Sequence, residues 1–214
     1  MDFMNVPLEK LATFLFLGTS VFAFCFTVMA TPIDIFRNTV SCYTLWGYKA
    51  DCGTVPYTSL PADWGTCGLV LLRWRFAEAF SIISIFFTFA TVVLILLELR
   101  TACAPLLFRI SSIASGGLAS ASLLIVWGLI VGFYETTYCP TFSRFGETNY
   151  DYGAGFGLFV TAFVLIFIGT GVQSFMFIRA GCTVAAADGV AEPSNEPAEQ
   201  QEGDAPKDTE GNAV

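Results

Sequence analysis

The chain of 214 residues contains no histidine. This absence excludes a Ser-His-Asp or Cys-His catalytic pair and any histidine metal ligand. The sequence shows no nucleophile motif and no metal-binding cluster, so we expect no enzyme activity, no catalytic residue, no metal and no cofactor. It also has no segment that is both basic and rich in aromatic residues, so no nucleic-acid partner is expected.

Charge is scarce as well. Charged residues make up 13% of the chain and hydrophobic residues 55%, with a mean hydropathy of +0.66. Because soluble domains contain about 25% charged residues, this composition indicates a membrane protein. The net charge of −8 is concentrated at one end: residues 183–214 contain eight acids and one lysine, which is −7, so residues 1–182 carry only −1. Residues 183–214 also have few large apolar side chains, which predicts a disordered cytoplasmic tail.

Within residues 1–182, four hydrophobic segments are long enough to cross a bilayer as helices. They cover about 11–30, 76–97, 110–133 and 153–178. The first exceeds the apolar core of about 7–15 residues found in signal peptides, so we interpret it as a retained span. The predicted fold is an all-α four-helix membrane bundle. Its two longer loops, 31–75 and 134–152, lie on the same side of the membrane.

Cysteine positions decide the orientation. Basic residues near the spans number four on one side and five on the other, so the positive-inside rule does not decide which side faces the cytoplasm. Four of the seven cysteines lie in the two loops that share a face: Cys42, Cys52, Cys67 and Cys139. Disulfides persist on the oxidising side of a membrane. We therefore expect both loops outside and both termini in the cytoplasm.

The loop cysteines have more than one possible pairing. Cys42 and Cys52 bracket a strand-like run, and a disulfide between them would stabilise a small extracellular β element; the alternative is two unpaired thiols. A second disulfide, Cys67 with Cys139, would tie the two loops together. Four cysteines allow three connectivities, and the sequence does not choose among them.

Residues 42–52 read CYTLWGYKADC. They satisfy each position of the amastin signature. The positions at which the signature allows one or a few residue types include Cys42, Thr44, Leu45, Trp46, Gly47, Lys49, Asp51 and Cys52. The chain therefore resembles the amastins, which are surface glycoproteins of kinetoplastid parasites. Its likeness to the claudins is weaker and architectural, because Leu45 and Trp46 lie between the two cysteines here and the corresponding pair precedes them in claudins.

The resemblance implies a multi-pass protein of the plasma membrane, exposed at the cell surface, that acts in parasite–host contact or in membrane organisation. The partners it implies are membrane lipid, host-membrane or other surface components, and further copies of the chain. The competing hypothesis is proton or small-ion transport. None of the five asparagines starts an Asn-x-Ser/Thr acceptor, so any glycan on this member would be O-linked.

Other residues have two interpretations each. Glu78 either forms an interfacial ion pair with Arg75, three residues earlier, or is an ion site. Trp46 is either the buried anchor of the β element or a binding contact, and Lys49 and Asp51 form either a solvated turn or a recognition site. Cys103 and Cys182, near the inner boundary, are either acylated or free thiols.

Overall fold

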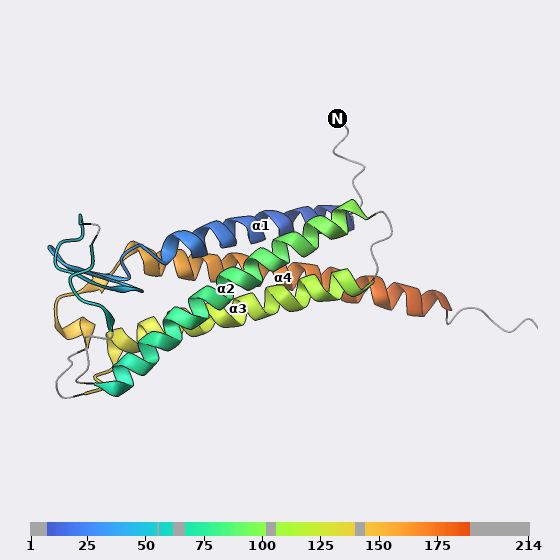
Figure 1. Ribbon diagram of the computed structural model, residues 1–214. Helices are drawn as coiled ribbons and strands as arrows, with labels where there is room; N and C mark the ends of the chain where they lie inside the picture. The colour runs from blue at the N-terminus through green and yellow to red at the C-terminus, as the bar shows by residue number, and fades with distance from the viewer. Residues whose placement is uncertain (1–7, 55, 62–66, 102–105, 140–143, 189–214) are drawn as a thin grey trace, which may run out of the picture. The chain divides into compact units, whose positions relative to one another are not determined.

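The computed structural model describes residues 8–54, 56–61, 67–101, 106–139 and 144–188, without the side chains of 8, 9 and 180–188. The chain divides into two units after Arg179, and the bundle belongs to the first. The helices are α1 (Leu8–Ala30), α2 (Gly68–Arg100), α3 (Leu106–Glu135) and α4 (Ala154–Asp188). Figure 1 shows them running side by side with a small sheet at one end. The predicted tail beyond residue 188 lies outside the described residues.

Each of the four helices contains a candidate membrane span, with a mean hydropathy between 1.9 and 2.7. The predicted fold class is therefore confirmed. Helix α2 has 33 residues, about 50 Å at 1.5 Å per residue, which exceeds a hydrocarbon core of about 30 Å. It begins at Gly68, eight residues before the expected start, because the helix continues out of the membrane on the side of the sheet.

Helices α2 and α3 pack along matching seams. Buried residues recur every three or four positions on both helices, an average period of about 3.5, which is the geometry of left-handed helix packing. On α2 the seam contains Val70, Trp74, Ala77, Ser81, Ser84, Thr88, Thr91 and Ile95. On α3 it contains Ser112, Ser115, Ala119, Ser122, Val126, Ile130 and Phe133.

These seams are rich in small hydroxyl side chains, whereas the exposed faces of the helices carry leucine, isoleucine and phenylalanine. Small residues let helix backbones approach closely in a membrane, where lipid is as apolar as a leucine side chain. Most of the hydroxyls donate to carbonyls of their own helix, as Thr88 does to Ser84 O at 2.8 Å. Ser115 of α3 instead donates to Phe87 O of α2 at 3.1 Å and bonds the two helices together.

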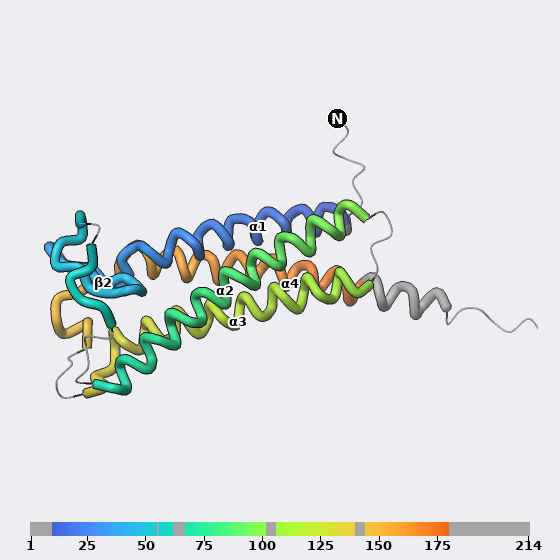
Figure 2. The backbone as a smooth tube through the Cα atoms, viewed as in Figure 1, coloured from blue at the N-terminus to red at the C-terminus, as the bar shows by residue number. Residues whose placement is uncertain are grey.

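The sheet has four antiparallel strands in the order β3-β2-β1-β4. Figure 2 labels β2 at the end of the bundle where the sheet lies. Strands β1 (Phe36–Arg37), β2 (Cys42–Thr44) and β3 (Gly47–Lys49) come from the first loop, as expected. Strand β4 (Asp151–Tyr152) comes from the second loop and was not predicted. Phe36 pairs with Tyr43 on one side and Tyr152 on the other, so the two loops form one sheet.

The sheet joins α4 without a linker. Gly153 donates its N–H to Ile35 O at 2.7 Å, and Gly155 donates to Asp34 O at 2.8 Å. A Cβ atom on either glycine would collide with the Asp34 backbone. These two glycines are therefore required by the close approach of the chain after α1 to the start of α4.

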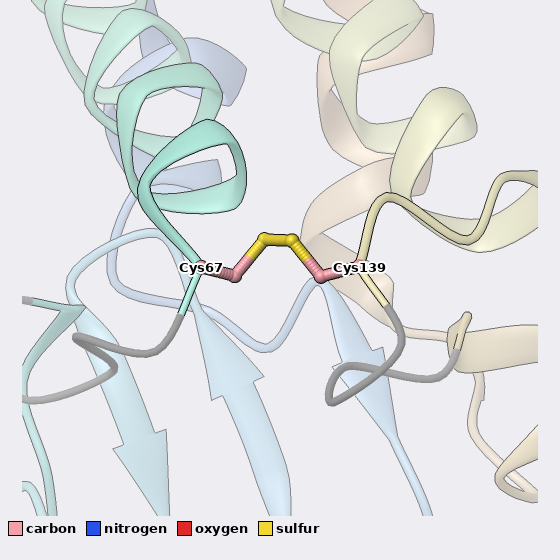
Figure 3. The surroundings of a disulfide bond; sticks show 2 residues. All are labelled: Cys67 and Cys139. Carbon is pink, nitrogen blue, oxygen red and sulfur yellow. A yellow bond between two sulfur atoms is a disulfide. The ribbon is translucent and has the colours of Figure 1, made fainter.

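A disulfide links Cys67 and Cys139, with their Cα atoms 6.2 Å apart (Figure 3). Cys67 directly precedes α2, and Cys139 lies four residues after the end of α3. The cross-loop pairing is thus the one present in the structure. It ties together the ends of two helices across 72 residues of sequence.

The disulfide gives a stability prediction. Cys67→Ser, Cys139→Ser and the double variant should each lower the free energy of unfolding by a similar amount, about 3 to 5 kcal/mol, because each removes the same long-loop cross-link. Thermal unfolding of the full chain in detergent under non-reducing conditions measures this. Losses that add in the double variant would show that the two cysteines have different partners.

Candidate functional site in the loop head

We call the described residues 31–61, 136–139 and 144–153 the head. Its two loops share one aromatic core: Phe36 stacks on Phe145 with ring centroids 4.3 Å apart, and Tyr43 meets Phe145 edge-on at 4.8 Å. The Ser41 hydroxyl also lies 2.6 Å from the Tyr150 hydroxyl. Burial raises the pKa of Tyr43, which keeps this phenol neutral.

Thr44 and Gly47 shape the turn between β2 and β3. The Thr44 hydroxyl accepts a hydrogen bond from Trp46 N at 3.2 Å and donates one to Gly47 O at 3.3 Å. A Cβ atom on Gly47 would lie 2.7 Å from Ser59 O, so only glycine fits against this neighbouring segment. Both signature positions therefore have structural roles.

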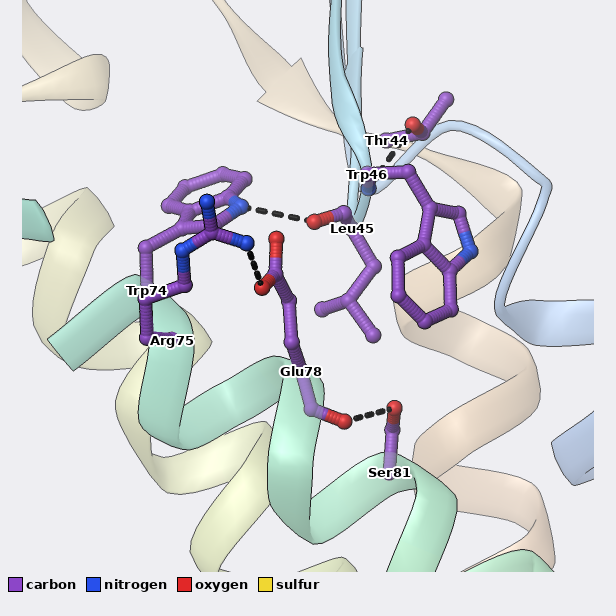
Figure 4. Close-up of polar contacts among 7 residues, drawn as sticks. All are labelled: Thr44, Leu45, Trp46, Trp74, Arg75, Glu78 and Ser81. Carbon is purple, nitrogen blue, oxygen red and sulfur yellow. Dashed lines mark hydrogen bonds and ion pairs between the residues drawn. The ribbon is translucent and has the colours of Figure 1, made fainter. Parts of the chain in front are cut away.

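The anchor of the turn is not the tryptophan that we predicted. Trp46 is only partly buried, whereas Leu45 is 1% exposed. The fully buried indole is that of Trp74 in α2, whose Nε1 donates to Leu45 O at 2.7 Å (Figure 4). Trp74 was not identified from the sequence because this residue precedes the expected span. A tryptophan just before a membrane span was the one feature of the sequence that could have identified it.

Lys49 and Asp51 both interact within the head. The Lys49 ammonium lies 5.0 Å from the centre of the Tyr57 ring. Asp51 is exposed, and its carboxylate accepts a hydrogen bond from Gly53 N at 2.9 Å. The polar-turn interpretation accounts for these contacts, and partner recognition stays a prediction.

The structure does not contain the predicted Cys42–Cys52 disulfide. Cys42 is a buried free thiol at the start of β2, and Cys52 is a partly buried one. Burial, together with a hydrogen bond to the Cys52 thiol, raises the pKa of Cys42 from 9.0 to about 12. The two thiols are thus neighbours in the head, and the disulfide between them stays a prediction.

Glu78 forms the predicted ion pair with Arg75: Arg75 Nη1 lies 2.7 Å from Glu78 Oε2, and the Glu78 side chain is 8% exposed. A second pair, Arg109 with Glu98 at 3.2 Å, links α3 to α2. The two glutamates are twenty residues apart, about 30 Å along a helix, which is the thickness of the hydrocarbon core. The ion pairs therefore mark the two membrane boundaries on α2.

Transport through Glu78 stays a prediction. Between the two glutamates, the buried side chains able to hydrogen-bond are Ser81, Ser84, Thr88 and Thr91. Each donates to a carbonyl of α2 itself, at 2.7 to 2.8 Å. Such bonds satisfy the hydroxyls locally and do not connect one to the next.

The structure gives no evidence on the two cysteines for which acylation was predicted. Cys103 lies outside the described residues, and Cys182 lies in α4 beyond the described side chains, so their acylation stays a prediction. Within the described part of the chain, no three Cys, Asp or Glu residues are grouped as they would be around a metal ion.

Fold and site together define a four-helix integral membrane protein whose two loops on one side form a single disulfide-linked head. The family model for the amastin surface glycoproteins matches residues 21–172, which includes the head and most of the bundle. The chain belongs to the amastin family. A search of curated proteins finds no match.

Trp74 gives the first prediction for this site. Trp74→Phe keeps most of the ring but removes the donor to the buried Leu45 carbonyl, which should lower the free energy of unfolding by about 1 to 3 kcal/mol. Trp46→Phe is the matched control and should cost less, because that ring is only partly buried. Thermal unfolding in detergent compares them. A larger loss for Trp46→Phe would restore Trp46 as the anchor.

The state of Cys42 and Cys52 can be read by alkylation. If they are oxidised to a disulfide, as we predict for the mature protein, neither should react with iodoacetamide at pH 8 in the folded chain. If both are free, Cys52 should react, whereas Cys42 should resist because it is buried and its pKa is about 12. Mass spectrometry of the peptides separates the two states, and modified Cys52 would contradict the disulfide.

Proposed function

We propose that this amastin acts at the cell surface through contact by its head, in parasite–host contact or in organising the surrounding membrane, and not by catalysis. The observation that carries the proposal is the joining of both loops into one sheet with one aromatic core. A head fixed in this way loses little conformational freedom when it binds a partner, which favours recognition.

The turn between β1 and β2 is the part of the head best suited to contact. Val40 is 64% exposed at its tip. The Asn38 side chain holds the turn by accepting hydrogen bonds from Val40 N at 2.9 Å and Ser41 N at 2.6 Å. The turn thus presents an apolar side chain on a preorganised backbone.

The contact function predicts a specific loss. Val40→Asp replaces the apolar tip with a charge while leaving the Asn38 bonds intact, so adhesion of cells displaying the full chain to host-cell monolayers should fall several-fold. Thr39→Asp is the matched control, since it adds the same charge to the neighbouring exposed position without removing an apolar side chain. Equal adhesion of wild type and Val40→Asp at equal surface level would contradict contact through this turn.

We also propose that the head faces outward and both termini face the cytoplasm, which the cysteine distribution supports. Because the chain has no N-glycosylation acceptor of its own, acceptors can be added one at a time. Pro56→Asn creates Asn-Tyr-Thr at an exposed head position, and Lys207→Asn creates Asn-Asp-Thr in the tail.

In eukaryotic cells, Pro56→Asn should add a glycan that an N-glycosidase removes, and Lys207→Asn should add none. Gel mobility with and without the glycosidase measures both. Glycosylation of Lys207→Asn alone would reverse the orientation.

A further inference from the structure

A cavity of about 350 Å³ lies between α3 and α4. Its size falls within the range of small-molecule sites, about 300 to 1,000 Å³. Its lining comes from both helices. Four residues are on α3 (Gly117, Ser120, Ala121 and Leu124), and five are on α4 (Phe163, Phe167, Thr170, Gly171 and Ser174). We call this cavity the α3–α4 groove.

The groove lies along the middle of the candidate membrane span of α3 and extends toward the end of α4 that lies away from the head. Ser174, at one end, is five residues before Arg179, where the candidate span ends. Phe163, at the other end, is eleven residues from Ser174, about 16 Å along the helix. Half of a hydrocarbon core of about 30 Å is about 15 Å, so the groove has the length of one lipid leaflet.

The walls of the groove suit a flat apolar body. Phe163 and Phe167 stack with ring centroids 5.6 Å apart and planes inclined by 26°. The small residues Gly117, Ala121 and Gly171 contribute no bulky side chain to the lining. Phe167 is 60% exposed, so the groove is open to lipid at this residue.

The lining also contains hydroxyls with unused hydrogen-bonding capacity. Thr170 is 9% exposed and Ser120 is 7% exposed, and the oxygens of both side chains have no hydrogen-bond partner. Ser174, one turn from Thr170, donates to Thr170 O at 2.7 Å, and its oxygen can still accept a bond. The Thr170 oxygen is itself buried against Gly116, so a rotation of this side chain is needed to present its hydroxyl beside Ser174 at one end of the groove.

We propose that the α3–α4 groove binds a membrane sterol. A sterol is a rigid, flat, apolar molecule of about one leaflet in length with a single hydroxyl, and that hydroxyl can accept from Thr170 and donate to Ser174. A flexible acyl chain fits less well, because ordering it costs conformational entropy and its body has no group to satisfy Thr170. The proposal is independent of the head and of its proposed contact function.

The test is photolabelling of the full chain in phosphatidylcholine vesicles with a diazirine-bearing cholesterol. We expect saturable labelling that unlabelled cholesterol displaces, with adducts in residues 117–124 and 163–174. Labelling that does not saturate, or that oleic acid displaces as well as cholesterol does, would overturn the proposal.

Glycine variants separate the groove from the general lipid-facing surface. Gly117→Leu and Gly171→Leu fill the groove, and a Cβ atom at either position meets nothing within 4 Å, so the bundle has room for it. Gly128→Leu and Gly157→Leu add the same bulk at open positions outside the groove. We expect saturable labelling to fall several-fold in the first pair and to be unchanged in the second; equal labelling in all four would contradict the site.

Thr170→Val tests the hydroxyl without filling the groove. The wild-type chain should bind cholesterol several-fold more tightly than its 3-methyl ether, and Thr170→Val should lose this preference while keeping its thermal stability. No preference in the wild type would refute recognition of the hydroxyl. Cross-links between two copies through residues 117–124 that cholesterol leaves undiminished would assign the groove to a second copy of the chain instead.

Discussion

Gly153 and Gly155 donate their backbone N–H groups to Ile35 and Asp34, and through these bonds the chain leaving α1 is joined to the chain entering α4. The pairing of β1 with β4 continues the same contact into the sheet. The other two helices reach the head through the Cys67–Cys139 disulfide, and α2 reaches it again through Trp74. Every helix of the bundle is thus held close to the head by a hydrogen bond, a disulfide or a short chain segment. Any function of the head depends on this arrangement.

The bilayer imposes the other main constraint. Away from water, a polar group needs a hydrogen-bond partner within the protein. Most hydroxyls of the α2 and α3 seams therefore donate to helix carbonyls, and the charged residues lie at the two membrane boundaries. The Arg75–Glu78 and Arg109–Glu98 pairs occupy those boundaries. The described helices also contain buried polar atoms without a hydrogen-bond partner, on Ser20, Glu98, Ser120, Trp127, Thr170 and Gln173. Of these residues, Ser120 and Thr170 line the α3–α4 groove.

Long-range features were the hardest to predict from the sequence. The four spans follow from hydropathy, and the Arg75–Glu78 pair follows from helical spacing, because both are local. Strand β4 has only two residues and gains its conformation from pairing with β1, so no local pattern identifies it. The choice of Cys139 as partner of Cys67 depends in the same way on the fold. Leu45 and Trp46 are adjacent in sequence, and only the position of Trp74 decides which of them is buried.

The two loops form one cooperative head. Hydrogen exchange of the full chain in lipid nanodiscs, resolved to individual amides, tests this most directly at Ile35, which donates to Tyr43 O, and at Gly153, which donates to Ile35 O. If the head is one unit, both amides should exchange through the same opening and show the same strong protection. Rapid exchange at Gly153 beside a protected Ile35 would mean that the second loop is not part of the sheet, and would contradict the account.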